Sequence, residues 1–509
     1  MFKKLLLLIP MLFSLCSCSI QEIQSFFDYI NGNTTLDDSS NNSSTDSQNK
    51  DSINLLKEAF NGFYDINGDA LKDSYHISYL PENQGVTYNT ITNNVQDLKY
   101  YDGKTPSKGD VRGLVIPIDF VDAPALTDVT GISKRVKDHS VSSYYYNSSY
   151  GKLNMTFDVL DWQRMSQRSS YYANLKYEYF GEVPGVSAIV HELFTTLDHK
   201  IDFSKYDNDG DSIIDCLYII YSKDIDYQYG KFWWAYNYYY LEDHLFDKVF
   251  PYSYVFAGYD FLFEEGYKEG LSTKTYIHET GHLFGLNDYY DYDTTKGYNK
   301  GGLGGADMMD YNVGDHNPFS KLSVGWIDVV QLVTLDDLKS LTLNLRPYSI
   351  FGDVLMICDN YNDKLGIFQD YFLVIYHDYP NTFITKDDVH KKNGIKVYRV
   401  HGVLTAHISS NGESYVDFKY DNSYTDYNLI DSIIANSKTK QVASNYGLYS
   451  KLTYNKQLAS DNDMFYKDYT CNTLAYYENN LNGTVSLSSY SFYVNDIIDS
   501  YATITVTKH

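Results

Sequence analysis

The sequence reads His-Glu-Thr-Gly-His-Leu-Phe-Gly-Leu-Asn-Asp from residue 278 to residue 288. His278 and His282 are four residues apart, so on a helix both imidazoles lie on one face and can reach one metal ion. Glu279 is the next residue along, and there its carboxylate can act as a base beside that ion. This stretch therefore predicts a helix that carries part of a metal site.

The second half of the stretch predicts how the chain leaves this helix. Gly285 permits a sharp turn, and Asp288 follows at the spacing at which the extended zincin signature has its third histidine. A lone His-Glu-x-x-His pattern occurs by chance in many helices, so much of the evidence for a metal site comes from Gly285 and Asp288. Together these residues predict a zinc site with His278, His282 and Asp288 as its ligands.

A second motif lies downstream, where Asp307-Met308-Met309-Asp310-Tyr311 resembles the methionine turn beneath the metal in metzincins. Aligning the centres of the two turns puts Met309 under the site. Tyr311 then takes the position at which some metzincins have a tyrosine near the metal, so we expect it to donate a hydrogen bond to the tetrahedral oxyanion. The alternative is that Met308 and Met309 are ordinary core residues.

The chain is similar to the immune inhibitor A family of secreted bacterial metallopeptidases, whose zinc motif is likewise His-Glu-x-x-His-x-x-Gly-x-x-Asp. The similarity covers residues from about 110 to 330. The segments that carry it besides the zinc motif are 113–120, 149–153, 202–207, 317–321 and 325–326, and it continues faintly through 370–374 and 394–400. One departure is Ile375, where family members often have an acidic residue, so no role of that acid can be carried over.

This resemblance implies a zinc-dependent endopeptidase that hydrolyses peptide bonds of extracellular proteins. In such enzymes zinc polarises the scissile carbonyl and lowers the pKa of a bound water. Glu279 would take the proton of that water and deliver it to the leaving amine. The alternative from another class is a catalytically weak surface lipoprotein that binds host protein or glycan through its β-rich region.

An acidic loop is the second candidate site, and it reads Asp207-Asn208-Asp209-Gly210-Asp211-Ser212-Ile213-Ile214-Asp215. Carboxylates at relative positions 1, 3, 5 and 9 suit an oxygen-lined calcium pocket with Asp207, Asp209, Asp211 and Asp215 as ligands. The loop departs from the EF-hand, because its glycine is at position 4 rather than 6 and no Glu follows at 12. The alternative is an acidic hairpin before a strand.

The first residues predict export and a lipid anchor. Lys3 and Lys4 precede an apolar stretch, 5–15, that is too short to span a bilayer comfortably. The following Leu-Cys-Ser-Cys ends at Cys18 and looks like a lipoprotein cleavage box. We expect 1–17 to be a signal peptide and Cys18 to be lipidated, which would leave the protein on the extracellular face of the bacterial cell membrane or released from it. The alternative is an ordinary secretory signal.

Composition narrows the classes of partner. The formal net charge of −25 over 509 residues argues against nucleic acid and is compatible with divalent cations. Besides Cys18, only Cys216, Cys358 and Cys471 remain after cleavage, so at most one disulfide is possible and buried thiols are the alternative. The 54 tyrosines suit half-buried sheets. We expect a monomer whose partners are protein or peptide substrates and, through the lipid anchor, the membrane.

The chain is too long for one hydrophobic core, so we expect several domains in an α+β fold. We expect the Asn-, Ser- and Asp-rich residues 18–52 to be a lipidated, disordered stalk, and 53–105 to be an N-terminal segment and candidate pro-region. Strands predicted at 111–120, 154–159 and 213–221 alternate with helices predicted at 185–198 and 276–283, and this order predicts a metzincin-like α/β zinc peptidase domain at 106–330. Weak helical periodicity afterwards predicts a β-rich, sandwich-like domain at 331–509.

Overall fold

The structure is a computed structural model of the whole chain. It describes residues 87–98, 104–138, 141–175, 184–240, 244–262, 274–292, 302–333, 340–379, 387, 389–408, 414–425, 427–435, 459–472, 474–478, 485–498 and 501–509. The predicted signal peptide, the lipidation site Cys18 and the predicted stalk lie outside these residues. The described chain forms two compact units. The N-terminal unit contains 104–147 and 152–286, and the C-terminal unit contains 87–98, 148–151 and residues from 287 onward.

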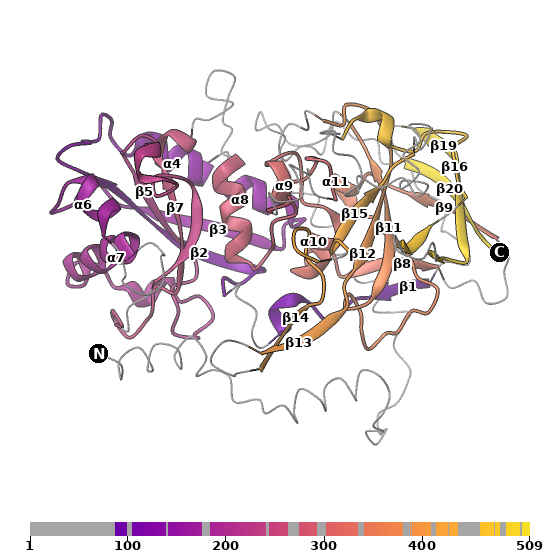
Figure 1. Cartoon of the computed structure of the whole chain (residues 1–509), viewed down its shortest axis with the longest axis horizontal. Coiled ribbons are helices and arrows are strands. Elements are labelled where there is room, and N and C mark those ends of the chain that lie inside the picture. Colours follow the sequence, from indigo (N-terminus) through magenta and orange to yellow (C-terminus); the bar gives the residue numbers. More distant parts are fainter. Residues whose placement is uncertain are drawn as a thin grey trace. The chain divides into compact units, whose positions relative to one another are not determined.

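The N-terminal unit is built on a mainly parallel sheet with the strand order β3-β2-β5-β7-β6 (Figure 1). The sheet contains β2 (Gly109–Asp119), β3 (Leu153–Val159), β5 (Leu217–Tyr221), β7 (Ser253–Gly258), the antiparallel edge strand β6 (Tyr236–Tyr239), and β4 (Gln163–Arg164), which pairs with β2. The strands predicted at 111–120 and 154–159 are thus present as β2 and β3. The strand predicted at 213–221 begins later, at Leu217.

The inner strand β2 has buried residues on both faces from Gly113 to Asp119, as is typical of a parallel strand covered on both sides. Gly113 lies where a side chain would not fit. A Cβ atom there would lie 2.7 Å from the Phe157 ring and 3.1 Å from the sulfur of Cys216. The glycine therefore allows β2 and β3 to pack closely.

Helices complete this unit. The predicted helix at 185–198 is α7 (Pro184–Leu197), which buries Val186, Ile189 and Leu193 against the sheet. Spacings of three and four residues place these side chains on one face. The other helices described in the unit are α4 (Thr130–Ser133), a π-helical turn (Lys134–Asp138), α5 (Val141–Ser148), α6 (Ser169–Asn174), α8 (Lys274–Leu283) and short 3-10 turns.

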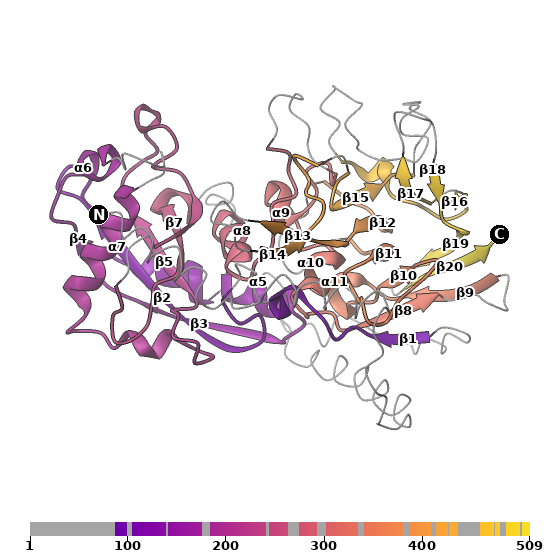
Figure 2. The ribbon, with the colours of Figure 1, turned by 60° about the horizontal axis from the view of Figure 1, so that its bottom comes forward.

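The C-terminal unit contains two sheets that share one hydrophobic core, as in a sandwich (Figure 2). The larger sheet contains β1 (Thr87–Thr90), β8 (Val329–Val333), β10 (Leu355–Ile357), β11 (Asp370–His377), β12 (Gly394–His401) and β15 (Ile430–Ile433). The smaller sheet contains β16 (Thr470–Cys471), β19 (Tyr490–Ile498), β20 (Tyr501–Lys508) and β9 (Ser340–Leu345). Both sheets contribute apolar side chains to the core between them.

Smaller elements flank these sheets. They are the hairpin β13–β14 (Leu404–Ile408 and Ser414–Phe418), the pair β17–β18 (Ala475–Glu478 and Val485–Leu487), and the short helices α9 (Met308–Tyr311), α10 (Pro318–Ser323) and α11 (Tyr348–Phe351). The chain thus has the mixed helix and sheet content that we expect of an α+β protein. Residues 287–330, which we expected to be part of the first domain, cluster here with the β-rich residues.

The N-terminal segment predicted at 53–105 is described from residue 87. Its first described residues form β1, which pairs antiparallel with β8 at the edge of the larger sheet. Thr87 lies opposite Leu332, and Thr90 lies opposite Val329. This part of the segment therefore contributes a strand to the C-terminal unit.

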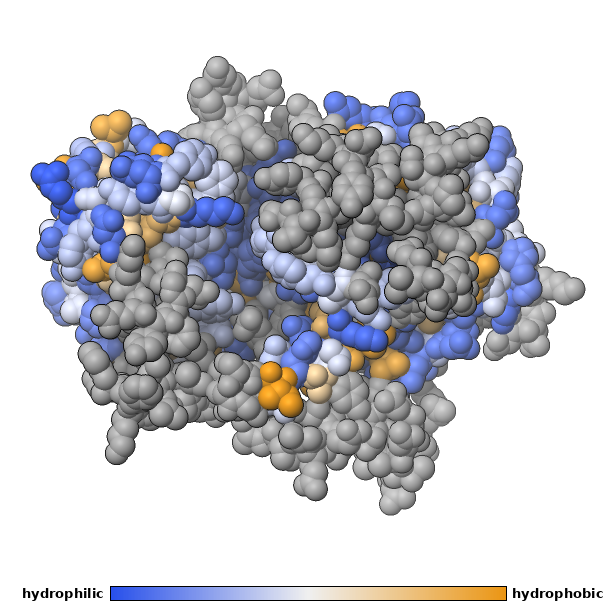
Figure 3. Space-filling model, in the orientation of Figure 1, coloured by the Kyte–Doolittle hydropathy of each residue, from blue (hydrophilic) through white to orange (hydrophobic). Residues whose placement is uncertain are grey.

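On the face shown in Figure 3, hydrophilic residues cover most of the described surface and hydrophobic ones occur singly or in small groups. Cys216, Cys358 and Cys471 are all buried free thiols. This result agrees with the alternative of buried thiols. Among the described helices, none combines the length and the apolar character that crossing a membrane requires.

A buried ion pair joins distant segments of the C-terminal unit. Lys321 has a fully buried side chain, and its Nζ lies 2.5 Å from a carboxylate oxygen of Asp315 and 3.0 Å from the hydroxyl of Tyr150. The same Nζ lies 4.3 Å from the ring centre of Tyr150 and 4.6 Å from that of Tyr348. Ser148 donates a further hydrogen bond of 2.6 Å to Asp315. The segments 148–151 and 315–321 are therefore held to each other by one charged network.

We predict that Lys321→Met destabilises the protein by about 3 kcal/mol, because it leaves the Asp315 carboxylate buried without its cation. Urea unfolding of the variant and the wild type measures this difference. Lys467→Met is the matched control: Lys467 pairs with Asp496 at 3.0 Å, but both side chains are about half exposed. The control should lose less than about 1 kcal/mol, and equal losses in the two variants would contradict the prediction.

Candidate metal centre

The helix that carries the predicted motif is α8, and buried tyrosines fix it to the sheet of the N-terminal unit. Tyr276 donates hydrogen bonds of 3.1 and 2.9 Å to the carbonyls of Ala257 and Gly258 at the end of β7. From β5, the hydroxyl of Tyr218 pairs with that of Thr280. Tyr145 on α5 donates to the carbonyl of Ile277. The helix is therefore held on several sides by hydrogen bonds inside an apolar core.

The functional side chains of α8 are largely shielded from water. His278 is 5% exposed and Glu279 is 7% exposed. The rings of His278 and His282 lie 5.0 Å apart between their centres, with an angle of 84° between their planes. Burial raises the pKa values of the Tyr145 and Tyr276 phenols, and the negative charge of the nearby Glu279 also raises them. Its carboxylate therefore lies in a region of low polarity, where electrostatic interactions are strong.

The chain reverses direction directly after α8, as Gly285 predicted. The amide of Leu286 donates to the carbonyl of Gly281 at 3.1 Å, and the amide of Gly285 donates to the carbonyl of His282 at 2.9 Å. This bond pair is a Schellman motif, which needs a left-handed residue at the position of Gly285. Gly285 has a φ of +86°. The glycine therefore ends the helix and sends the chain back towards the two histidines.

The same turn orients one imidazole. The Nδ1 atom of His282 lies 2.8 Å from the carbonyl oxygen of Leu286. A carbonyl only accepts hydrogen bonds, so Nδ1 carries the proton and Nε2 is left as the atom that can bind a metal. His282 is thus held in one tautomer by a residue of the turn itself.

The third predicted ligand returns to the histidines. Ligand atoms of His278, His282 and Asp288 all lie within 4.8 Å of one another. Two imidazoles and one carboxylate form a donor set that suits zinc and other first-row transition metals. The structure therefore brings together all three residues that the sequence predicts as ligands.

Tyr289, next to Asp288, fixes this ligand in the C-terminal unit. Its amide donates to the carbonyl of Met309 at 2.8 Å, and its hydroxyl lies 2.8 Å from that of Ser320. Asn422 donates to its carbonyl at 3.0 Å. Tyr289 is fully buried, so both its backbone and its side chain are anchored.

The predicted methionine turn is a single turn of helix, α9, in which Met308 and Met309 are fully buried. Asp307 caps this turn, because its carboxylate accepts the amide of Met309 at 2.8 Å. The same carboxylate accepts the backbone and side-chain amides of Asn317 at 2.8 and 3.0 Å. Burial raises the pKa of Asp307 to about 7 against the opposing effect of these bonds. The turn is thus attached to the start of α10.

Two tyrosines near the site differ in what the structure says of them. Tyr311, the predicted oxyanion donor, ends α9 and is 49% exposed. Its catalytic role remains a prediction. Tyr292 was not singled out from the sequence, yet its hydroxyl donates to the carboxylate of Asp288. Tyr290 in turn donates to Tyr292 at 3.1 Å. The spacing of Tyr292 from Asp288 was the available signal, but four-residue spacing outside a helix does not predict contact.

The acidic loop brings together part of its predicted ligand set. Ligand atoms of Asp207, Asp209 and Asp215 lie within 4.8 Å of one another. Asp211 is not in this group, and its carboxylate accepts the amide of Ile213 at 2.8 Å. Asp207 itself accepts the amides of Gly210, Asp211 and Ser212 at 2.8 to 3.1 Å. The loop is therefore folded around the Asp207 carboxylate.

Asp215 is the buried member of this loop and is only 1% exposed. Its Oδ2 accepts the backbone and side-chain amides of Asn208 at 2.6 and 2.9 Å. Its Oδ1 has no hydrogen-bond partner among the described residues. Burial, with smaller contributions from the neighbouring Asp209 and Asp211, raises the pKa of Asp215 to about 7 against the opposing effect of the Asn208 hydrogen bonds. A carboxylate in this setting suits a cation, because a cation would offset both burial and repulsion.

No protein-family model matches the chain, and a search of curated proteins finds none that is similar.

We predict that Gly285→Ala weakens divalent-metal binding and lowers the free energy of unfolding by about 1–2 kcal/mol, because an L side chain is strained in the left-handed region. Isothermal titration with zinc and urea unfolding measure the two effects. Gly285→Asn is the matched control, since asparagine tolerates this conformation better. Equal losses in both variants would show that the backbone conformation is not the cause.

Proposed function

We propose that this chain is a zinc-dependent endopeptidase of metzincin-like fold, with His278, His282 and Asp288 as the zinc ligands and Glu279 as the base. The observation that supports the proposal most directly is that ligand atoms of these three side chains lie within 4.8 Å of one another, while Glu279, next to His278 on α8, is a buried carboxylate. Chance occurrence of the short motif does not explain the return of Asp288. The resemblance to the immune inhibitor A family points to the same activity.

The residues present fit zinc. Zinc in catalytic sites takes three protein ligands and leaves a further position open to water or substrate. His282 has the neutral tautomer that a ligand needs, because Leu286 accepts its other N–H. Tyr292 donates to Asp288, and it thereby orients the third ligand. When bound, zinc would act as a Lewis acid towards the peptide carbonyl and the attacking water.

The remaining chemistry belongs to the side chains of the protein. The Glu279 carboxylate would accept a proton from the attacking water and later deliver it to the leaving amine. Glu279 is buried, so little bulk water competes with the attacking water for its carboxylate. Tyr311 would donate a hydrogen bond to the oxyanion. Met309 would contribute packing beneath the site through the turn that holds Tyr289.

We further propose that the enzyme is lipid-anchored through Cys18 on the extracellular face of the cell membrane, where its substrates are extracellular proteins. We propose calcium as a second metal, held by Asp207, Asp209 and Asp215. The buried Oδ1 of Asp215 supports the calcium site. Such a cation would stabilise the loop that leads into β5, a central strand of the sheet under α8.

We predict that Glu279→Gln lowers casein cleavage by at least about a hundredfold, because the amide cannot accept the proton of the attacking water. A fluorescent casein assay measures the rate, with and without a zinc chelator. The chelated wild type should lose its activity and regain it on addition of zinc. Metal analysis should find equal zinc in the variant and the wild type, because Glu279 is not a ligand.

The same assay separates the endopeptidase from a binding lipoprotein. If the wild type holds zinc but cleaves no protein in a broad panel, the proposed activity is wrong and the binding alternative gains support. If His282→Ala retains both zinc and activity, the assigned ligand set is wrong.

We predict that calcium at about a hundredfold excess over its Kd stabilises the wild type by about 2–3 kcal/mol. Asp209→Ala should lose this gain, because it removes one of three converging carboxylates. Thermal unfolding with calcium or with a calcium-selective chelator measures the effect. Asp198→Ala, at an exposed position after α7, is the matched control and should keep the full gain. An unchanged calcium response in Asp209→Ala would show that calcium does not bind at this loop.

A further inference from the structure

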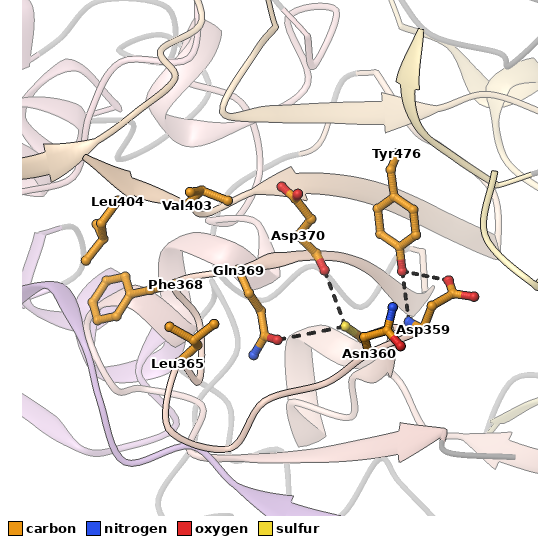
Figure 4. Close-up of a pocket in the computed structure, with 10 residues that line it drawn as sticks. Asp359, Asn360, Leu365, Phe368, Gln369, Asp370, Val403, Leu404 and Tyr476 are labelled. Atoms are coloured by element: carbon orange, nitrogen blue, oxygen red, sulfur yellow. Dashed lines mark hydrogen bonds between the residues drawn. The ribbon is translucent and has the colours of Figure 1, made fainter. Parts of the chain in front are cut away.

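The C-terminal unit contains a pocket of about 420 Å³. It lies where β10, β11, β13 and β17 begin or end (Figure 4). Its volume falls within the range of small-ligand sites. The pocket is lined by Cys358, Asp359, Asn360, Leu365, Phe368, Gln369, Asp370, Val403, Leu404 and Tyr476.

One side of this pocket is apolar. Leu365, Phe368, Val403 and Leu404 lie together on that side in Figure 4. Phe368 and Leu404 are 6% and 7% exposed, and the Phe368 ring packs against that of Phe418 at 6.1 Å. Phe418 in turn packs against the Phe319 ring at 5.7 Å, so an aromatic cluster supports this wall. Such a wall suits a hydrocarbon stem.

The other side is polar and carries Asp359, Asn360, Tyr476 and, nearer the middle, Asp370. Asp359 accepts the hydroxyl of Tyr476 at 2.9 Å and the amide of Ser489 at 2.6 Å. Burial opposes ionisation of Asp359, but these hydrogen bonds outweigh it and lower its pKa. The group is therefore a carboxylate at neutral pH and is fixed in position.

Asp370 supplies the second carboxylate, at the start of β11. Its Oδ1 lies 2.9 Å from Nδ1 of His401, which is fully buried. Burial lowers the pKa of His401, and Asp370 offsets that effect only in part. The imidazole is thus neutral at pH 7. It donates a hydrogen bond to Asp370 but does not offset the negative charge of that carboxylate. The side chain of Asp370 keeps 23% of its surface exposed.

The nearby basic residues Arg399 and Lys419 lie outside the pocket lining, although the charge of Lys419 interacts with Asp370. Arg399 pairs with Asp431 at 2.7 Å and donates to the backbone of Ala475 and Tyr476, behind the pocket wall. Lys419 is exposed, and its Nζ lies 4.9 Å from the ring centre of Tyr420. Neither residue lines the pocket. The ten lining residues include two acids and no basic side chain.

We propose that this pocket binds an arginine or lysine side chain of an extracellular protein or peptide, with the stem against Phe368 and Leu404 and the charged end at Asp370 and Asp359. Charge complementarity supports this occupant, because a basic side chain combines an apolar stem with a cation. The net charge of −25 attracts basic partners in the same way. The pocket is a binding site for the partner, whether or not the partner is cleaved.

The test uses fluorescence anisotropy with a labelled alanine-based peptide that contains one arginine, and with its citrulline counterpart. Citrulline has nearly the same shape and no charge. The full chain carries Glu279→Gln so that no peptide is cleaved. We expect the arginine peptide to bind on the order of tenfold more tightly than the citrulline peptide. This preference should shrink as salt rises.

Variants locate the preference. Asp370→Asn keeps an acceptor for His401 and removes the charge, so it should bind both peptides alike. Asp363→Asn is the matched control, because Asp363 is exposed on the adjoining loop and does not line the pocket. It should keep the preference. Val403→Lys adds a cation at the half-buried edge of the pocket, and it too should remove the preference.

Several outcomes would overturn the proposal. Equal binding of the two peptides by the parent protein would show that the pocket does not recognise a positive charge. An arginine preference that survives in both Asp370→Asn and Val403→Lys, with circular dichroism showing folded protein, would place the preference at another site. Agmatine that binds as tightly as the peptide would assign the pocket to free amines. A chain without peptidase activity that still shows the preference leaves this inference standing, because binding is measured without turnover.

Discussion

The candidate metal centre depends on one backbone constraint, which is that α8 must end at Leu283 and the chain must turn back at Gly285. The left-handed φ of Gly285 allows the two Schellman hydrogen bonds, and they place Leu286 where its carbonyl holds His282. Without this reversal Asp288 would continue away from the histidines. Tyr289 then secures the returning chain through Met309, Ser320 and Asn422. Gly285 thus determines where α8 ends, which tautomer His282 adopts and where Asp288 lies.

Buried tyrosines have a structural role that composition alone did not reveal. Tyr145, Tyr218 and Tyr276 each combine a packed ring with a hydrogen bond that fixes α8. Tyr150 and Tyr348 enclose the ammonium of Lys321 in the same manner. A phenol fills core volume and satisfies one polar partner, so it can attach a polar element within an apolar interior. The abundance of tyrosine is therefore more than a preference for sheets.

The sequence predicted best where a short pattern controls local geometry. The motif at 278–288 identified α8, its end and three side chains that meet, because spacing on a helix and a glycine turn are local properties. An apolar run, an alternating pattern and a helical spacing likewise located β2, β3 and α7, respectively. Long-range contacts were not predictable in this way. The hydrogen bond from Tyr292 to Asp288 depends on how the loops fold. The same is true of the absence of Asp211 from the cluster that Asp207, Asp209 and Asp215 form. The grouping of 287–330 with the β-rich unit involves long-range contacts too, among them the buried network of Asp315 and Lys321 with Tyr348.

That network has a consequence for how the protein is made. The C-terminal unit takes residues 148–151 from the middle of the N-terminal unit, and the Tyr150 hydroxyl donates to the carbonyl of Tyr348 at 2.8 Å. Chain synthesis must therefore pass residue 348 before this part of the core can close, and β1 must wait for β8. The segments 87–90 and 148–151 therefore reach their final places only after part of the C-terminal unit has been made.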